Sequence, residues 1–172
     1  MTDQGPTPSA LRSELQASRA SLFGNIHDLG EEQFRHVPSG ESWSIAAHLA
    51  HLLRVERVFI ERARAALVEH EPNIASTRAL NDDDPALAQH LAVPQIIHGM
   101  QAARRDLDAL LASCAEPALE RAMIHERLGR MTVRDIAVKM ADHEFEHAEA
   151  IATLAKQAPS VRRATIPLTR RS

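Results

Sequence analysis

The chain has 172 residues, a length typical of one domain with a hydrophobic core of its own. Its formal net charge of −3 argues against a nucleic-acid-binding protein, because such proteins usually present basic patches. The single cysteine, Cys114, excludes an intramolecular disulfide. We find neither a signal-peptide core nor an apolar run as long as a membrane span, so we expect a cytoplasmic protein with no membrane partner.

The first predicted helix covers residues 7–29. Thr7 followed by Pro8 is typical of an N-cap with proline at the first helical position. Apolar side chains recur every four or seven residues and predict one buried face, formed by Leu11, Leu15, Leu22 and Ile26. We expect Gly30 to end this helix and residues 31–41 to form a connector with a Pro-Ser-Gly turn.

The second predicted helix covers residues 42–69, with Ser42 or Ser44 as its cap. His51 lies beside the apolar stripe of this helix. The stripe consists of Ile45, His48, Leu49, Leu52, Val55, Phe59, Ala63 and Ala66. Residues 70–83 then form a long polar connector, whose length fits either a binding loop or a disordered segment.

Asp84 and Pro85 predict the N-terminus of a short helix, again as an N-cap followed by proline. The third long helix is expected at residues 94–114. Its apolar face is formed by Ile97, Met100, Leu107, Leu110 and Leu111. Residues 115–130 are interpreted as a further connector that contains at most a short helical turn.

The fourth long helix is predicted at residues 132–156, where Thr132 and Asp135 have the spacing of a capping box. Two histidines, His143 and His147, replace apolar residues on its buried stripe. The whole stripe reads Val133, Ile136, Met140, His143, His147, Ile151 and Leu154.

Four long helices and the near absence of β-branched runs predict an all-α protein. We expect an up-down four-helix bundle with long connectors over residues 1–160. Residues 161–172 contain four arginines and no acidic residue, which predicts a basic, flexible and disordered tail.

The histidines carry the functional signal. A spacing of four places His143 and His147 on one helix face, one turn apart, where they can bind one transition metal. A third imidazole from another helix, such as His51, would complete a three-nitrogen site with an open position, which is typical of a reactive centre. Carboxylates such as Asp142 or Glu146 could orient the rings. The alternative is that these histidines are ordinary core residues.

His143-Glu144-Phe145-Glu146-His147 also matches the HExxH pattern of zinc proteases, in which the glutamate is the general base. Those enzymes normally take a third ligand downstream of the second histidine. Here no histidine follows His147, and the only later acid is Glu149, so we do not expect a metalloprotease. A role for Glu144 as a base in another hydrolysis stays open.

Two segments together carry a family resemblance. The second helix follows a Trp-Ser pair, and His51, paired with Leu52, lies eight residues past Trp43. The last helix combines the pair His143 and His147 with an opening made of Gly129, Thr132, Val133 and Arg134. In both segments the chain resembles the DinB/YfiT-like family of bacterial metal-binding four-helix bundles, over residues 8–157.

The resemblance implies a divalent metal held by His51, His143 and His147, with zinc or nickel ahead of iron or manganese. It selects His51 rather than His48 as the third ligand, so His48 is expected beside the ligands or facing the substrate. Arg54 is a candidate for binding a carboxylate of the substrate, although it also fits a solvated helix face.

The resemblance further implies an enzyme that acts on a small molecule. One branch is similar to thiol-dependent S-transferases that use a low-molecular-weight bacterial thiol such as bacillithiol or mycothiol, and we rank this reaction first. A second branch is similar to metal-dependent hydrolases. Other members are stress- or damage-inducible proteins without an assigned activity, so a non-catalytic metal-binding protein is the third alternative. Members are often homodimers, which we expect here as well.

Overall fold

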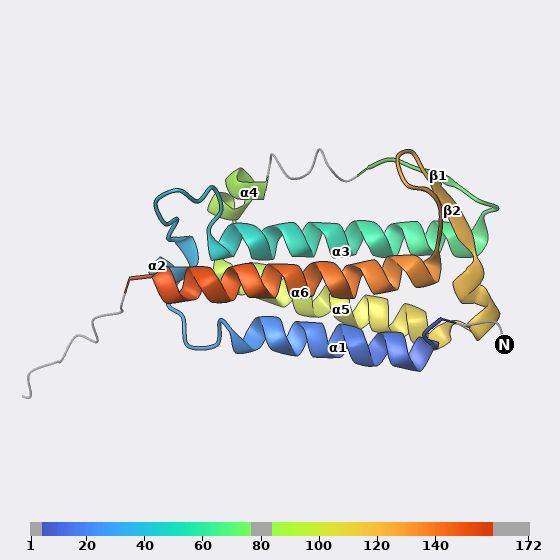
Figure 1. Cartoon of the computed structure of the whole chain (residues 1–172), viewed down its shortest axis with the longest axis horizontal. Coiled ribbons are helices and arrows are strands. Elements are labelled where there is room, and N and C mark those ends of the chain that lie inside the picture. Colours follow the sequence, from blue (N-terminus) through green and yellow to red (C-terminus); the bar gives the residue numbers. More distant parts are fainter. Residues whose placement is uncertain (1–4, 77–83, 160–172) are drawn as a thin grey trace, which may run out of the picture.

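The computed structural model describes residues 5–76 and 84–159. Four long helices lie side by side and confirm the predicted four-helix bundle (Figure 1). They are α1 (Pro8–Gly24), α3 (Ile45–Val68), α5 (Val93–Ser113) and α6 (Val133–Gln157). Two shorter helices, α2 (Glu31–Arg35) and α4 (Asp84–His90), lie in the connectors at one end of the bundle. The predicted tail, residues 161–172, lies outside the described residues.

Hydroxyl side chains cap three of the long helices, as the sequence predicts. The Thr7 hydroxyl accepts the backbone N–H of Ala10 at 3.2 Å, and Ser44 caps α3 in the same way. At α6, Thr132 and Asp135 bond each other's backbone N–H groups in a capping box. The predicted end of the first helix was wrong, because α1 stops at Gly24 and Gly30 instead caps α2.

Neighbouring helices do not alternate strictly in direction along the chain. Arg12, near the start of α1, pairs with Asp108, near the end of α5, so these two helices are antiparallel. By contrast, α3 and α5 run parallel (Figure 1). The reason is the long connector 69–92, after which α5 starts at the same end of the bundle as α3.

A small three-stranded sheet covers the other end of the bundle, where the sequence predicted only connectors. Its strands are β1 (Asn73–Ile74), β2 (Ala122–His125) and β3 (Gly129–Thr132). Strand β1 is parallel to β2, and β2 pairs antiparallel with β3. The hairpin closes through a three-residue loop, and Gly129 has a φ of +73°, a left-handed conformation that favours glycine.

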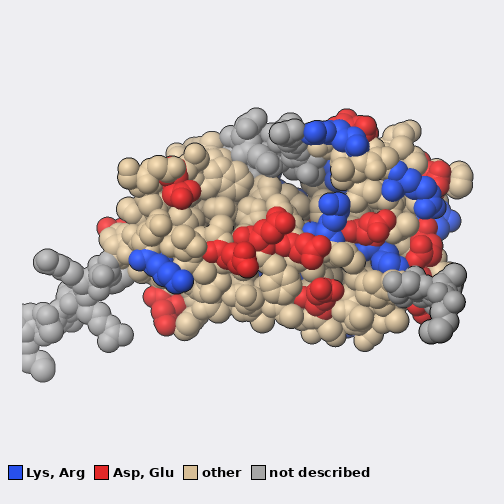
Figure 2. Space-filling view, in the orientation of Figure 1, with Lys and Arg blue, Asp and Glu red and all other residues tan. Residues whose placement is uncertain are grey.

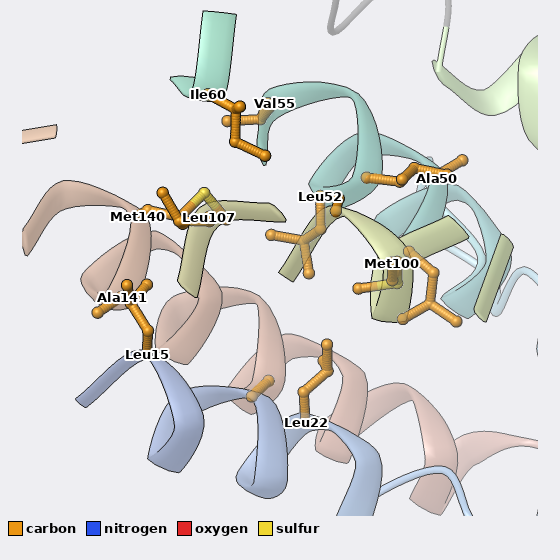
Figure 3. Close-up of a cluster of buried hydrophobic side chains, with 14 of the residues drawn as sticks. Leu15, Leu22, Ala50, Leu52, Val55, Ile60, Met100, Leu107, Met140 and Ala141 are labelled. Atoms are coloured by element: carbon orange, nitrogen blue, oxygen red, sulfur yellow. The ribbon is translucent and has the colours of Figure 1, made fainter. Parts of the chain in front are cut away.

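All four long helices contribute to one apolar core. Side chains from each of them point into the space between the helices, among them Leu22, Leu52, Met100 and Met140 (Figure 3). Each of these four is 0% exposed. Within the described ranges, we find no helix that combines the length and the apolar character needed to cross a membrane.

Candidate metal centre

Two pairs of histidines face each other across the seam between α3 and α6. The Nε2 atoms of His51 and His143 lie 3.0 Å apart. One turn away, the Nδ1 atoms of His48 and His147 lie 2.7 Å apart. The pairing follows from helix geometry, because the two helices are antiparallel and carry histidines three and four residues apart on the faces in contact.

Three of these residues have the geometry of a metal site. Single ring nitrogens of His51, His143 and His147 all lie within 4.8 Å of one another. Nitrogens bound to zinc at 2.0–2.1 Å are separated by about 3–3.4 Å, so small ring rotations would bring the set to ligand distances. His51 is 3% exposed and the other two rings are half-buried. The residues present therefore fit a transition metal.

His48 lies beside this group of three rather than within it. Its Nδ1 contacts the Nδ1 of His147, so the Nε2 of His147 is the nitrogen that remains available for a metal. Trp43 packs against the same rings, with centroid distances of 5.1 Å to His48 and 5.2 Å to His51. The sequence left open whether His48 or His51 belongs to the set of three, and the geometry favours His51.

Burial and neighbouring rings lower the pKa of three histidines of the cluster, which favours their neutral form. Burial, together with His143, His48 and His51, lowers the pKa of His147 to about 2. Burial and the nearby His51 lower the pKa of His48 to about 4, and the same two causes lower the pKa of His143. A neutral imidazole has a free lone pair, which is the form that binds a metal.

A cavity of about 580 Å³ is lined by two of these histidines, His51 and His143. Among the predicted accessory residues, Asp142 lines it close to His143, and so does Glu146, whose carboxylate is 3.7 Å from the His143 Nδ1. Arg54 is half-buried on α3 and is not among the lining side chains. The structure thus brings Asp142 to the site and places Arg54 outside the cavity.

Sequence reasoning missed the end of the cavity nearest the sheet, which is lined by Arg62, His125 and Arg127, and it missed Lys139, which lines the cavity one turn before His143. His125 and Arg127 belong to the hairpin that the sequence analysis interpreted as a connector. The available signal was the run Ala122–His125 followed by Gly129, a pattern typical of a short hairpin with a three-residue loop.

Glu144 has a different role from the one left open by the HExxH pattern. It is 0% exposed, and its carboxylate accepts hydrogen bonds from Ser18 at 2.5 Å and Arg19 at 2.5 Å, both on α1, and from Arg104 on α5 at 2.8 Å. The carboxylate therefore turns into the bundle and does not line the cavity. The geometry favours a structural role for Glu144 over the base role that the sequence left open, because these partners occupy both of its oxygens.

Glu144 belongs to a closed ring of buried charges with one member from each long helix. Arg19 and Arg104 each pair with both Glu56 and Glu144, at distances between 2.5 and 2.8 Å. The guanidinium groups also donate to the backbone carbonyls of Met100 and Leu15. Two positive and two negative charges cancel, and no buried side-chain nitrogen or oxygen in the described residues lacks a partner.

A four-helix bundle with facing histidines belongs to the class of bundles that build metal sites between their helices. The chain is a member of the DinB superfamily, whose family model matches residues 14–151. This confirms the family predicted from the sequence.

The chain is also similar to individual proteins. It is 25% identical over 147 residues to the uncharacterised protein YuaE of Bacillus subtilis (strain 168). This match covers 78% of this chain and 91% of YuaE.

Two solved structures have the same fold. YfiT from Bacillus subtilis, described as a probable metal-dependent hydrolase with an unusual four-helix bundle topology, matches with a TM-score of 0.76 and 16% identity. That match covers 87% of this chain and 86% of YfiT. TT2238, a four-helix bundle protein, matches with a TM-score of 0.62 and 17% identity over 86% of this chain and 99% of that one.

Proposed function

We propose that His51, His143 and His147 hold one divalent transition metal and that the protein is a metal-dependent enzyme acting on a small molecule. The observation that carries the proposal is the group of three ring nitrogens within 4.8 Å, of which His51 and His143 line a cavity of about 580 Å³. Three protein ligands leave a coordination position open toward the cavity, which is the arrangement of catalytic rather than structural sites.

The donor set narrows the choice of metal. Three imidazoles suit zinc, nickel and iron better than magnesium or calcium, so we propose zinc or nickel first and iron or manganese second. Such a metal would supply Lewis acidity and lower the pKa of a water or thiol bound at the open position.

Residues around the three ligands prepare the site for this chemistry. His48 contacts the Nδ1 of His147 and so fixes the orientation of the ring while its Nε2 remains available for the metal. Trp43 packs against the His48 and His51 rings. Asp142 and Glu146 line the cavity beside His143, where a carboxylate can accept a proton from an incoming nucleophile.

Two reactions fit this site. In the first, a low-molecular-weight thiol loses its proton and its sulfur attacks an electrophilic carbon, so that a C–S bond forms and a leaving group departs. The resemblance in the sequence favours this thiol transfer, with the thiol as a cosubstrate. In the second, water is the nucleophile and the reaction is a hydrolysis. The similarity to YfiT, described as a probable metal-dependent hydrolase, favours this alternative.

Metal content tests the site. We expect about one metal per chain in the native protein purified without a tag, and less than a tenth of that in His147→Ala. His98→Ala is the matched control, because His98 is an exposed histidine on α5 and should leave the metal content unchanged. If the native protein binds none of zinc, nickel, iron or manganese after reconstitution, the proposal is wrong.

Activity then separates the reactions. Metal-loaded protein is incubated with 1-chloro-2,4-dinitrobenzene and a series of low-molecular-weight thiols, and separately with p-nitrophenyl acetate. Metal-dependent release of chloride with a thiol supports transfer, and metal-dependent release of nitrophenolate without a thiol supports hydrolysis. A protein that binds metal but accelerates neither reaction nor related thiol transfers and hydrolyses would be a non-catalytic metal-binding protein.

A further inference from the structure

The cavity is an elongated groove between α3 and α6. Along α3, His51, Val55, Phe59 and Arg62 all line it, at steps of four, four and three residues that keep them on one helix face. Eleven residues of helix between His51 and Arg62 correspond to about 16 Å. A ligand that spans the groove therefore extends well beyond the immediate neighbourhood of the histidines.

The two ends of the groove differ in charge, and its middle is apolar. Beside the histidines the groove is lined by two acidic residues, Asp142 and Glu146, and Lys139 lies one turn further along α6 toward the sheet. The apolar side chains come from α3, α6 and the sheet, namely Val55, Phe59, Ile74, Leu128, Met131 and Ile136. Arginine and lysine gather toward the sheet end of the molecule, and acidic side chains run along the middle of the same face (Figure 2).

Three cations that line the groove have no ion-pair partner among the described residues, although the Glu126 carboxylate acts on Arg62 from a distance. Among the described residues, Arg62, Arg127 and Lys139 form no ion pair with a carboxylate, although all three line the groove. Arg62 donates to the carbonyl of Ala75. Glu126, the acidic residue of the hairpin loop, accepts the backbone N–H of Ser76 at 2.8 Å and is not a lining residue.

His125 lies among these cations with a defined tautomer. Its Nδ1 accepts the backbone N–H groups of Arg127 at 3.1 Å and Leu128 at 3.2 Å, so the proton of the neutral ring is on Nε2. The residue is 7% exposed and lines the groove. Burial and the nearby Arg62 lower its pKa, which keeps the ring in this neutral form as a hydrogen-bond donor.

We infer that Arg62, His125, Arg127 and Lys139 bind the anionic head group of an elongated small molecule whose apolar middle lies along the groove. Guanidinium, ammonium and imidazole N–H groups are the donors that carboxylates and phosphates require. The acidic residues at the histidine end repel an anion, so the molecule binds in one orientation, with its uncharged end toward His51 and His143. Only the reaction at that end rests on the proposed function.

The test uses the full-length, metal-free protein and calorimetric titration. Octanoate and octyl phosphate are the anionic probes, and 1-octanol is the uncharged probe of similar length. The variant Arg127→Gln/Lys139→Gln removes two exposed cations of the groove. The control Arg64→Gln/Lys156→Gln removes two exposed cations that do not line it, so both variants lose the same charge.

We expect both anionic probes to bind the native protein more tightly than octanol, and the tighter of the two to identify the head group. The groove variant should weaken anion binding roughly tenfold or more, the loss typical of a charge-assisted hydrogen bond, and leave octanol unchanged. Equal affinity for octanoate, octyl phosphate and octanol, or an equal loss in the control variant, would overturn the inference.

Zinc binding is measured separately on the same variants, and it should be unchanged because none of the four substituted residues is a proposed ligand. Loss of anion binding in the groove variant supports the inference even if the protein binds no metal. Conversely, a protein with one metal per chain and no preference for anions would retain the proposed function and refute this inference.

Discussion

Replacement of Glu144 tests whether this residue is structural or catalytic. The carboxylate is 0% exposed and accepts three hydrogen bonds, from Ser18, Arg19 and Arg104. In Glu144→Ala both guanidinium groups lose one of their two carboxylate partners and stay buried. Removing one partner from a buried ion pair typically costs about 3–5 kcal/mol, because the remaining charge is left uncompensated. We expect a loss of this size in the free energy of unfolding.

Urea denaturation followed by circular dichroism measures the loss, with Trp43 fluorescence as a second probe. In a protein of this size the same change lowers the melting temperature by roughly 6–20 °C. Glu149→Ala is the matched control, because Glu149 is an exposed glutamate of the same helix, and it should change stability by less than about 0.5 kcal/mol.

A catalytic base behaves differently. Its removal would leave the free energy of unfolding nearly unchanged and abolish hydrolysis by the metal-loaded protein. If Glu144→Ala does not fold, Glu144→Gln keeps the shape of the side chain and removes only its charge. A loss below about 1 kcal/mol in either variant would refute the assignment of Glu144 to a stabilising ring of charges.

Three further predictions concern the histidines. His48→Ala should weaken zinc affinity about 10–100-fold without changing the number of zinc ions bound at saturation, because the loss of a residue that orients a metal ligand has an effect of this size. Unchanged affinity in a calorimetric titration would contradict the positioning role of His48. The metal-free protein should lose stability as the pH falls below about 6.5, at up to about 1.4 kcal/mol per pH unit for each of His48 and His147. Their pKa values, about 4 and about 2, are lower in the folded than in the unfolded chain, so acid favours the unfolded state. The free energy of unfolding, measured by denaturation at pH 7 and pH 5, should therefore change less in His48→Gln than in the native protein. An equal change in both proteins would contradict a contribution from His48. Zinc at 100 times its dissociation constant should stabilise the native protein by about 2.7 kcal/mol, and a chelator should reverse this; the same stabilisation in His147→Ala would argue against the proposed ligands.

Local signals in the sequence predicted the local parts of the structure. Thr7, Ser44 and Thr132 cap their helices because a hydroxyl next to the first turn satisfies a free N–H whatever surrounds it. The spacing of His143 and His147 likewise predicted a shared helix face. The choice of His51 came from the family resemblance, and the structure brings it within 3.0 Å of His143.

The features that the sequence analysis missed depend on contacts between distant segments. Arg19, Glu56, Arg104 and Glu144 each look like a single charged residue on a different helix, and only the packed bundle makes them one ring. The strands of the sheet are two to four residues long, too short for a clear alternating pattern, and β1 is 48 residues from its partner β2. The cationic end of the groove was missed for the same reason, because the hairpin brings His125 to it.

The HExxH segment contributes residues to both the histidine cluster and the ring of buried charges, because consecutive helical residues point about 100° apart. His143 faces α3 and the groove, and Glu144, one residue later, faces the interior ring. Glu56 follows His51 by five residues, so the ring and the histidine cluster connect the same two helices. A slip of one turn would move α6 by about 5.4 Å and separate His51 from His143, but it would also take Glu144 away from two buried guanidinium groups and leave each with only one carboxylate partner, Glu56. The ring therefore opposes the displacement that would take the proposed ligands apart.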